Sequence, residues 1–327
     1  MLNRRHTLAL AGLSVGATMP RTAFAAWPDR PLRVVVPYAA GGNIDVVSRL
    51  LAPSLSERFG QPVVVDNRPG AGGSLGAEQV ARAAPDGYTL LAGSNGPITV
   101  NPLVQARLPY EPLRDFTPIA LVNAVPLVLM VTNGTTATNI QEAVALSKAQ
   151  AGVFTTGTPG AGSTAHLTLE LFNSATGATL VHVPYRGGGA IVPDFMSGNI
   201  RAMFTELSTA LPLHKDKKGR ILAIASAHRS TLLPEVPTFI EAGVPDFVAA
   251  SYCGLLAPRA TPASVVTALQ DAIVATTSSS DIRAKLEALG SEMASGTEQT
   301  PAGFTAFLQR QAADARRAAE LAGLKPE

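Results

Sequence analysis

The chain has 327 residues, of which 15% are charged, with a formal net charge of +2 and one cysteine. Three arginines and no acidic residue precede residue 26, so the remaining 302 residues carry a net charge of −1. A nearly neutral chain without a basic run excludes nucleic acid and an anionic membrane surface as expected partners, and the lone Cys253 excludes an internal disulfide.

Residues 1–25 have the pattern of an export signal. The basic pair Arg4-Arg5 precedes an apolar stretch at 7–17, and small residues lead to a predicted cut after Ala25. This stretch is shorter than the roughly 20 apolar residues that span a bilayer, so an uncleaved anchor is the less favoured alternative. We expect export to the periplasm by the Sec or the twin-arginine route, without membrane insertion after cleavage.

Strand-like and helix-like segments alternate after residue 26. Residues 32–36 are almost wholly apolar and β-branched, which is typical of a strand covered on both faces. The expected elements that follow are a helix at 44–59 ending at Gly60, a strand at 63–65, a helix capped by Ser74 and running to about residue 84, and a strand at 88–92. This βαβαβ order predicts parallel strands with right-handed crossovers.

The same order recurs in the second half of the chain. Strands are expected at 127–131, 153–156, 180–183, 202–204 and 221–225, and helices at 140–150, from the 157–163 turn to near Gly177, and after 189. From Pro262 onward, helices are expected at 265–275, 282–289 and 304–321. Because no low-complexity linker is present, the length predicts two lobes of about 150 residues joined by strand crossings, with the tail returning to the first lobe.

Three glycine-rich turns each connect a predicted strand to a predicted helix. We call residues 38–43, 67–74 and 157–163 the first, second and third elbows. Backbone N–H groups at a helix start lie at the positive end of the helix dipole and bind anions without a catalytic side chain. Because open parallel sheets bind ligands at the carboxyl ends of their strands, the elbows predict a cleft between the lobes that closes on a small acid.

Enzymatic and metal-binding alternatives rest on weaker patterns. Residues 160–165 match the dinucleotide pattern G-x-G-x-x-A, but the next strand ends at 182–185 without the acid that a nucleotide site requires. Ser163 and His166 suggest an exported hydrolase or isomerase, although no G-x-S-x-G elbow is present and no acid is obviously placed to orient His166. The histidine spacing matches no metal motif. We therefore expect no catalytic residue, no metal and no cofactor.

Several side chains near the elbows have both a structural and a ligand-binding interpretation. Asp45 either stabilises its helix dipole or receives a ligand ammonium, hydroxyl or water. Arg186 either clamps a carboxylate or stays solvated, and His166 either contacts a ligand oxygen or is a satisfied surface histidine. Tyr38 and Tyr185 each end a strand, and they either wall the cleft or lie at a core edge.

Residues 63–77, with the sequence VVVDNRPGAGGSLGA, resemble the signature of the Bug receptors, the extracytoplasmic solute-binding components of tripartite tricarboxylate transporters. Residues 85–91, 108–110, 182–187 and 233–238 are similar to further blocks of that family, and the resemblance runs from about Pro28 to the end. It implies the type 2 periplasmic binding protein fold, an α/β fold whose two lobes each hold a mixed, mostly parallel sheet flanked by helices.

The resemblance also implies a domain division and a site. Residues 26–125 with 247–327 form the expected lobe 1, and residues 126–246 form lobe 2. Backbone groups and waters of the first and third elbows are expected to hold a ligand carboxylate. The expected partners of a monomeric chain are this small carboxylate and inner-membrane transporter subunits; a ligand-sensing input to a signalling partner is the alternative. The predicted ligand-binding residues are Tyr38, Ala39, Ala40, Gly41, Gly42, Asn43, Ile44, Asp45, Ser94, Thr156, Gly157, Thr158, Gly160, Gly162, Ser163, His166, Tyr185, Arg186, Gly187 and Thr205.

The chain departs from the family pattern at positions near the expected pocket. Ile44 stands where the family usually has a threonine, which removes a hydroxyl donor. Thr205-Glu206 stands where many relatives carry an aspartate first. These two changes predict a ligand that differs from a common dicarboxylate. Tyr252 replaces a frequent tryptophan, which we interpret as a change in packing.

Overall fold

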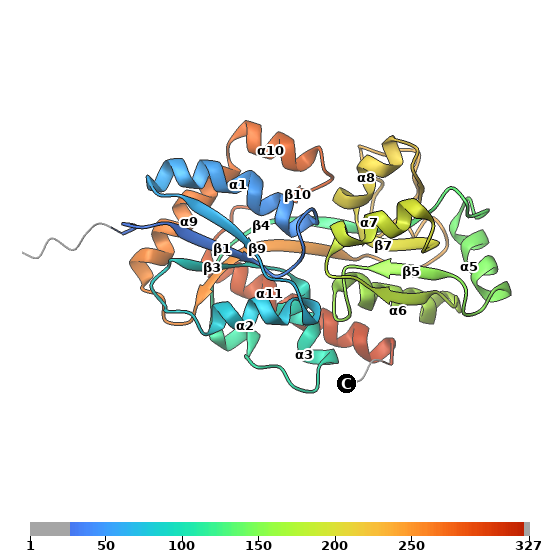
Figure 1. The fold of residues 1–327 in the computed structure, drawn as a ribbon, viewed down its shortest axis with the longest axis horizontal. Helices are drawn as coiled ribbons and strands as arrows, with labels where there is room; N and C mark the ends of the chain where they lie inside the picture. The colour runs from blue at the N-terminus through green and yellow to red at the C-terminus, as the bar shows by residue number, and fades with distance from the viewer. Residues whose placement is uncertain (1–26, 324–327) are drawn as a thin grey trace, which may run out of the picture.

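Alternating strands and helices make up the computed structural model, which describes residues 27–323 (Figure 1). The predicted signal peptide and its cut after Ala25 lie outside the described residues. The strands form one continuous sheet in the order β2-β1-β3-β9-β4-β7-β5-β6, and β8 and β10 also pair with β4.

The first strands and helices confirm the predicted βαβαβ unit. It consists of β1 (Leu32–Val36), α1 (Asn43–Phe59), β2 (Val63–Asn67), α2 (Ser74–Ala81) and β3 (Thr89–Gly93). Strand β1 pairs in parallel with both β2 and β3, as predicted. The prediction that Ser74 caps α2 is wrong, because Gly73 holds the cap position. The Ser74 hydroxyl instead donates to Gln105 Oε1 at 3.0 Å and accepts from Asn101 Nδ2 at 2.7 Å.

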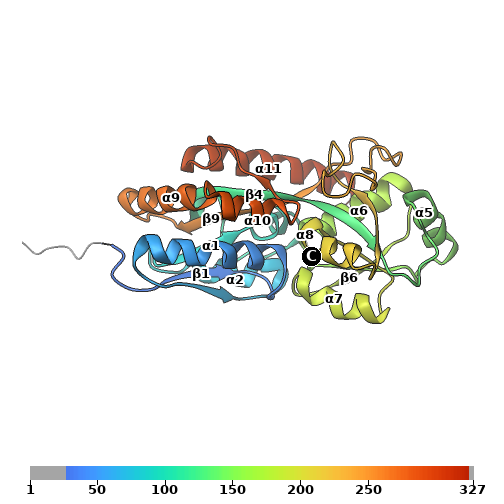
Figure 2. The same ribbon diagram turned by 90° about the horizontal axis from the view of Figure 1, so that it is seen from above.

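The long strand β4 runs from one part of the molecule into the other (Figures 1 and 2). Strand β4 (Phe116–Val131) first pairs antiparallel with β9 (Ala250–Pro258), and its last five residues pair with β7 (Ala202–Glu206). The sequence pattern predicts only 127–131 as a strand here and none at 250–258. The missed part of β4 is buried on both faces and therefore lacks an alternating pattern, and Pro118 sits where its register shifts.

The second part of the chain forms a second βα arrangement. Its elements are α5 (Ile140–Ala149), β5 (Thr155–Thr158), α6 (Thr164–Thr176), β6 (Val181–Pro184), α7 (Gly188–Ser197), β7, α8 (Leu207–Lys215) and β8 (Arg220–Ile224). Strand β5 pairs in parallel with β6 and β7, and it begins two residues later than predicted. Helix α8 was absent from the predicted elements. We use lobe 2 for these elements with the end of β4, and lobe 1 for β1 to β3, β9, β10, the first part of β4 and their helices.

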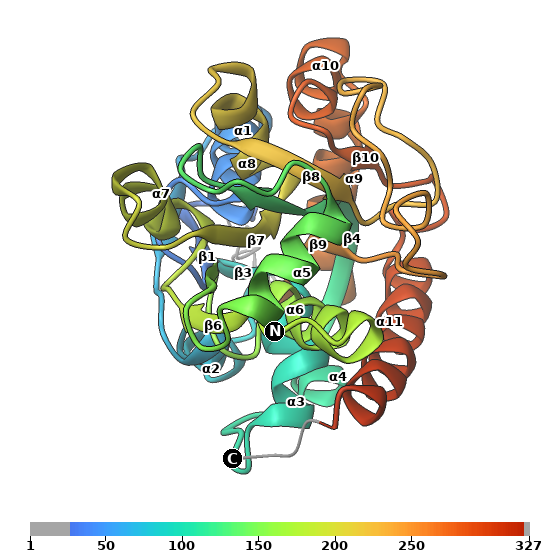
Figure 3. The same ribbon diagram turned by 90° about the vertical axis from the view of Figure 1, so that its right-hand side faces the viewer.

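The C-terminal elements pack against the elements of lobe 1. They are α9 (Ala263–Thr277), α10 (Ser280–Glu287), the short β10 (Glu292–Met293) and α11 (Pro301–Leu321). The Ser54 hydroxyl of α1 lies 3.1 Å from that of Thr276 in α9. Helix α11 also reaches lobe 2, where its Ala315 packs in one apolar cluster with Leu167 of α6 (Figure 3).

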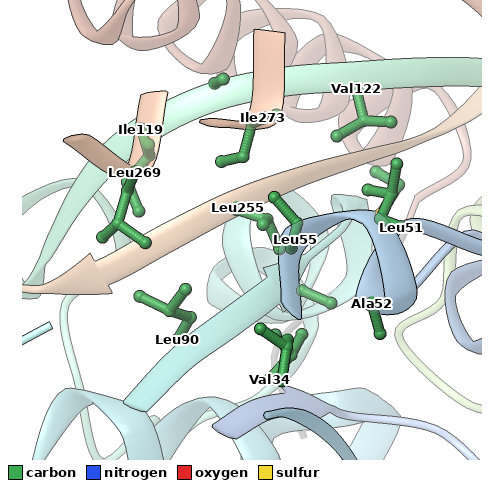
Figure 4. Close-up of a cluster of buried hydrophobic side chains, with 14 of the residues drawn as sticks. Val34, Leu51, Ala52, Leu55, Leu90, Ile119, Val122, Leu255, Leu269 and Ile273 are labelled. Carbon is green, nitrogen blue, oxygen red and sulfur yellow. The ribbon is translucent and has the colours of Figure 1, made fainter. Parts of the chain in front are cut away.

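Helices cover both faces of the sheet in lobe 1. On one face, α1 and α9 pack against β1, β3, β4 and β9 through buried side chains such as Val34, Leu55, Leu90 and Ile273 (Figure 4). Fully burying a side chain of this kind contributes about 1.5–3 kcal/mol relative to leaving it exposed. The same packing holds the start of α1 at the carboxyl end of β1, where the first elbow lies.

Candidate ligand-binding site

Four helix starts converge between the two lobes. Helix α1 of lobe 1 and helices α6, α7 and α8 of lobe 2 each place their first turn beside one cavity of about 20 Å³. The cavity is lined by Tyr38, Gly42, Asn43, Ile44 and Ser251 from lobe 1 and by Pro159, Ser163, Thr164, Gly188 and Glu206 from lobe 2. Because N–H groups at helix starts carry partial positive charge, this convergence favours an anion.

The lobes are in contact across this cavity. The Ala39 N–H of the first elbow donates to the Arg186 carbonyl at 2.7 Å. The Ser208 hydroxyl at the start of α8 donates to Asn43 Oδ1 at 3.2 Å. Because the lobes touch each other beside this cavity, a ligand can enter it only when the lobes separate.

Asp45 organises the first elbow from within lobe 1. Its carboxylate accepts from the Gly41 N–H at 2.9 Å, from Arg49 Nε at 2.9 Å and from Asn67 Nδ2 at 2.9 Å. Burial acts to raise the pKa of Asp45, but these hydrogen bonds outweigh it and hold the pKa below its ordinary value. The side chain does not line the cavity, so the contacts agree with the structural interpretation of Asp45.

The two predicted aromatic walls lie in different surroundings. Tyr38 lines the cavity, and its hydroxyl lies 3.1 Å from that of Ser94. Burial raises the pKa of Tyr38 above its ordinary value, so the ring keeps its proton at neutral pH. Tyr185 does not line the cavity; its hydroxyl donates to Asp194 Oδ2 at 2.7 Å and its ring packs at the edge of the lobe 2 core.

Two stacked histidines support the third elbow. The ring centroids of His166 and His182 are 4.0 Å apart, and His182 Nε2 lies 2.7 Å from the Thr158 hydroxyl oxygen. His166 Nδ1 accepts from the Gly162 N–H at 3.2 Å, so the proton of a neutral His166 ring lies on Nε2. The His166 main-chain N–H donates to Ser163 Oγ at 3.2 Å, which makes Ser163 the cap of α6.

The buried His182 ring predicts that the protein loses stability in mild acid. Burial, and after it the nearby His166, lowers the pKa of His182 from 6.5 to about 3. The unfolded chain takes up a proton near pH 6.5 and the folded chain does not until about pH 3, so unfolding becomes easier as the pH falls below 6.5. Because the ring is partly exposed, we expect a loss on the order of 1 kcal/mol between pH 7 and pH 5.

This loss is measured by urea unfolding of the protein and of His182→Gln at the two pH values. Glutamine keeps a polar atom near the Thr158 hydroxyl but does not titrate. The variant should lose less stability on acidification than the unchanged protein. Equal losses in the two proteins would contradict the role of His182.

The second elbow lies beside the third elbow rather than at the cavity. Gly72 approaches the Ala161 carbonyl so closely that a Cβ atom would stand 2.2 Å from its oxygen. The Gly72 carbonyl accepts from Asn101 Nδ2 at 3.1 Å, and the Ala71 carbonyl accepts from Gln105 Nε2 at 2.9 Å. The second elbow therefore joins the two lobes and contributes no lining residue to the cavity.

The structure brings part of the predicted site together at the cavity. Tyr38, Gly42, Asn43, Ile44 and Ser163 line it. The other predicted residues do not line it, and they are Ala39, Ala40, Gly41, Asp45, Ser94, Thr156, Gly157, Thr158, Gly160, Gly162, His166, Tyr185, Arg186, Gly187 and Thr205. The Arg186 side chain is exposed, and Thr205 is buried one residue from the lining Glu206.

Four lining residues fall outside the predicted site, whereas Pro159 belongs to the third elbow, which the prediction includes. Gly188 follows the loop after the predicted strand at 180–183, and Glu206 follows the predicted strand at 202–204, so their positions were a signal that could have found them. Thr164 directly follows the third elbow. Ser251 belongs to β9, which the pattern does not predict as a strand, and no local signal points to it.

Several larger hollows lie elsewhere on the described part of the molecule. One of about 530 Å³ is lined mainly by the 225–232 loop and the α10–β10 turn, one of about 440 Å³ lies between α6 and α11, and two of about 820 and 550 Å³ lie on lobe 2. None of these four is surrounded by converging helix starts from both lobes, which is why the small cavity is the candidate site. Within residues 27–323, no group of three or more metal-ligating side chains is present, and no helix has the length and apolar character needed to cross a membrane.

Comparisons with known proteins agree with this geometry. A family model described as the tripartite tricarboxylate transporter family receptor matches residues 47–320. Protein BugT of Bordetella pertussis is 37% identical over 272 residues, which cover 82% of this chain and 83% of BugT. The structure of R. palustris Rpa4515 with adipate has a TM-score of 0.88 at 34% identity and covers 92% of this chain and all of that one (100%). The structure of MatC from Rhodopseudomonas palustris with bound malate has a TM-score of 0.86 at 31% identity and covers 89% of this chain and 99% of that one.

Proposed function

Because the chain belongs to the tripartite tricarboxylate transporter receptor family, we propose that it captures a small organic acid in the periplasm and delivers it to the membrane subunits of such a transporter. The resemblance to the Bug receptors and the two-lobe α/β fold are confirmed. The family consists of solute-binding receptors rather than enzymes. Adipate and malate in two similar structures support a carboxylate as the ligand.

The observation that carries the proposal is the convergence of helix starts from both lobes on one cavity. Each helix dipole stabilises a nearby anion by about 0.3–1 kcal/mol, and more in a partly buried position. N–H groups from α1 on one side and from α6 and α7 on the other replace the water that a carboxylate gives up. A ligand held by both lobes stabilises their closed arrangement.

We propose that residues 26–125 with 247–327 and residues 126–246 move as two bodies. The connection between them passes through β4 and the residues just before β9, where the Leu127 N–H donates to the Ala249 carbonyl at 2.9 Å. At this point strand β4 stops pairing with β9 and begins to pair with β7 and β8. Rotation there opens the cleft without breaking either hydrophobic core.

The hydrolase alternative has no support in the contacts of Ser163. Its hydroxyl oxygen accepts from the His166 main-chain N–H, as a helix cap does, and the His166 ring stacks on His182. The remaining alternative, a ligand-sensing input to a signalling partner, uses the same cleft and the same ligand.

Thermal unfolding of the chain that follows Ala25 tests the proposal. The panel contains mono-, di- and tricarboxylates, amino acids and aromatic acids. A ligand at 100 times its Kd stabilises the folded state by about 2.7 kcal/mol, which raises Tm by several degrees in a protein of this size. We expect a shift with at least one acid and no product in the mixture. An unchanged Tm with every acid would contradict the carboxylate site, and conversion of an acid would contradict the receptor role.

A further inference from the structure

Glu206 places an acidic side chain in the middle of the anion site. It ends β7, holds the cap position of α8, and lines the cavity with Tyr38, Asn43 and Ser163. Only 9% of the residue is exposed. The starts of α6 and α7 in lobe 2 and of α1 in lobe 1 therefore face the Glu206 side chain as well as any bound anion.

The surroundings of Glu206 hold hydroxyl groups and no cation. The Thr205 hydroxyl donates to Glu206 Oε2 at 3.1 Å, and the Ser251 hydroxyl also hydrogen-bonds to this carboxyl group. Tyr38 is the other titratable side chain among the lining residues of the cavity, and it interacts electrostatically with Glu206. Among residues 27–323, no lysine, arginine or histidine forms an ion pair with Glu206. Burial raises its pKa, as expected for a buried carboxylate without a positive partner.

Asn43 supplies the opposite kind of group. Its Oδ1 accepts from the Ser208 hydroxyl, but its buried Nδ2 has no hydrogen-bond partner in the described part of the chain. A buried N–H donor without a partner is costly, and Asn43 is only 4% exposed and lines the cavity. The cavity thus presents an unused donor at Asn43 and an acceptor at Glu206.

A ligand that satisfies both groups carries an acceptor and a positively charged donor close together. The carboxylate of an amino acid matches Asn43 Nδ2 and the helix starts, and its ammonium ion matches Glu206. A dicarboxylate also satisfies the donors, but it brings a second negative charge toward the buried carboxylate of Glu206. The repulsion between these charges weakens its binding.

We propose that Glu206 is a specificity residue that makes this receptor select zwitterionic amino acids over amine-free carboxylates of the same length. The inference rests on the proposed function, because it concerns the same cleft. The position of Glu206 matches the departure from the family pattern at Thr205-Glu206.

Calorimetric titration at pH 7.5 tests this with three pairs of acids of matched length: alanine with propionate, aspartate with succinate, and glutamate with glutarate. In the unchanged protein, at least one amino acid should bind at least tenfold more tightly than its amine-free partner. Glu206→Gln keeps the shape of the side chain and removes its charge, so that ratio should fall at least tenfold. Glu235→Gln is the control, because it removes an exposed carboxylate from the same lobe (62% exposed).

Each result of these titrations decides between the two proposals. Tighter binding of the amine-free acids to the unchanged protein would overturn the role of Glu206 and leave the carboxylate receptor standing, and this measurement needs no variant. A ratio that Glu206→Gln leaves unchanged would overturn it as well. Absence of binding for all six acids and for the wider carboxylate panel would overturn the proposed function itself.

Discussion

Replacing Gly189 by alanine is expected to weaken ligand binding roughly 5- to 150-fold while the ligand-free protein stays folded. In the closed arrangement, a Cβ atom at Gly189 would stand 2.5 Å from the Ala40 carbonyl oxygen and 2.9 Å from the Gly41 carbonyl carbon. Both neighbours are backbone atoms of the first elbow in the opposite lobe, so they move only if the lobes move. Overpacking of this kind costs about 1–3 kcal/mol, which corresponds to this loss of affinity.

The open form should tolerate the same change. Gly189 lies in the first turn of α7, and its backbone does not have the positive φ that disfavours alanine. Alanine is favoured over glycine in a helix by up to about 1 kcal/mol. The thermal midpoint without ligand should therefore stay the same or rise, while titration with a ligand found in the panel shows the loss of affinity.

Gly134→Ala is the matched control for this substitution. It lies in the same lobe, and the nearest atom to its added Cβ, the Thr132 hydroxyl oxygen, is 4.0 Å away. We expect its affinity to equal that of the unchanged protein. Unaltered binding by Gly189→Ala would show that the lobes do not close as this structure has them.

Replacing Phe172 by alanine is expected to destabilise the protein by about 3–5 kcal/mol. Phe172 is 0% exposed and lies at the centre of the lobe 2 core. Its ring centroid is 6.2 Å from that of Phe204, 5.7 Å from that of Phe239 and 6.0 Å from that of Phe247, each in an edge-on arrangement. Aromatic pairs of this kind contribute about 0.5–1.5 kcal/mol beyond the area that they bury.

Urea unfolding measures this loss, with Phe172→Leu as the matched control. Leucine fills most of the space and should cost less than the alanine variant, because the cavity it leaves is smaller. Phe172 does not line the cavity, so the folded alanine variant should still bind the ligand at saturating ligand concentration in the absence of urea. A loss below about 1 kcal/mol for alanine would show that the lobe 2 core repacks around the gap.

Local patterns in the sequence account for most of the elements and for the elbows. The apolar, β-branched run at 32–36 and the helix after it depend on contiguous residues, and both appear as β1 and α1. The glycines of the first and third elbows mark strand-to-helix turns for the same local reason. The family blocks also lie in short stretches, which is why the family could be predicted before any contact was known.

Single side-chain roles were harder to predict. Asp45 had two interpretations. Its contact with Arg49 is local to α1, but its contact with Asn67 forms only after α1 and β2 pack together. Ser163 and His166 looked like a catalytic pair by spacing, but the contact between them uses the main chain of His166.

The tertiary structure alone decided which groups surround the cavity. Strands β4 and β9 are buried on both faces, so they carry no alternating pattern, and their pairing brings Ser251 beside residues far away in the sequence. The same pairing sets the two lobes face to face, so that the second elbow packs on the third and leaves the cavity to the first and third. Glu206 is an ordinary acid after a strand until α8 and the opposite lobe bury it among helix starts. The charge of the site follows from long-range packing that no local stretch of sequence contains.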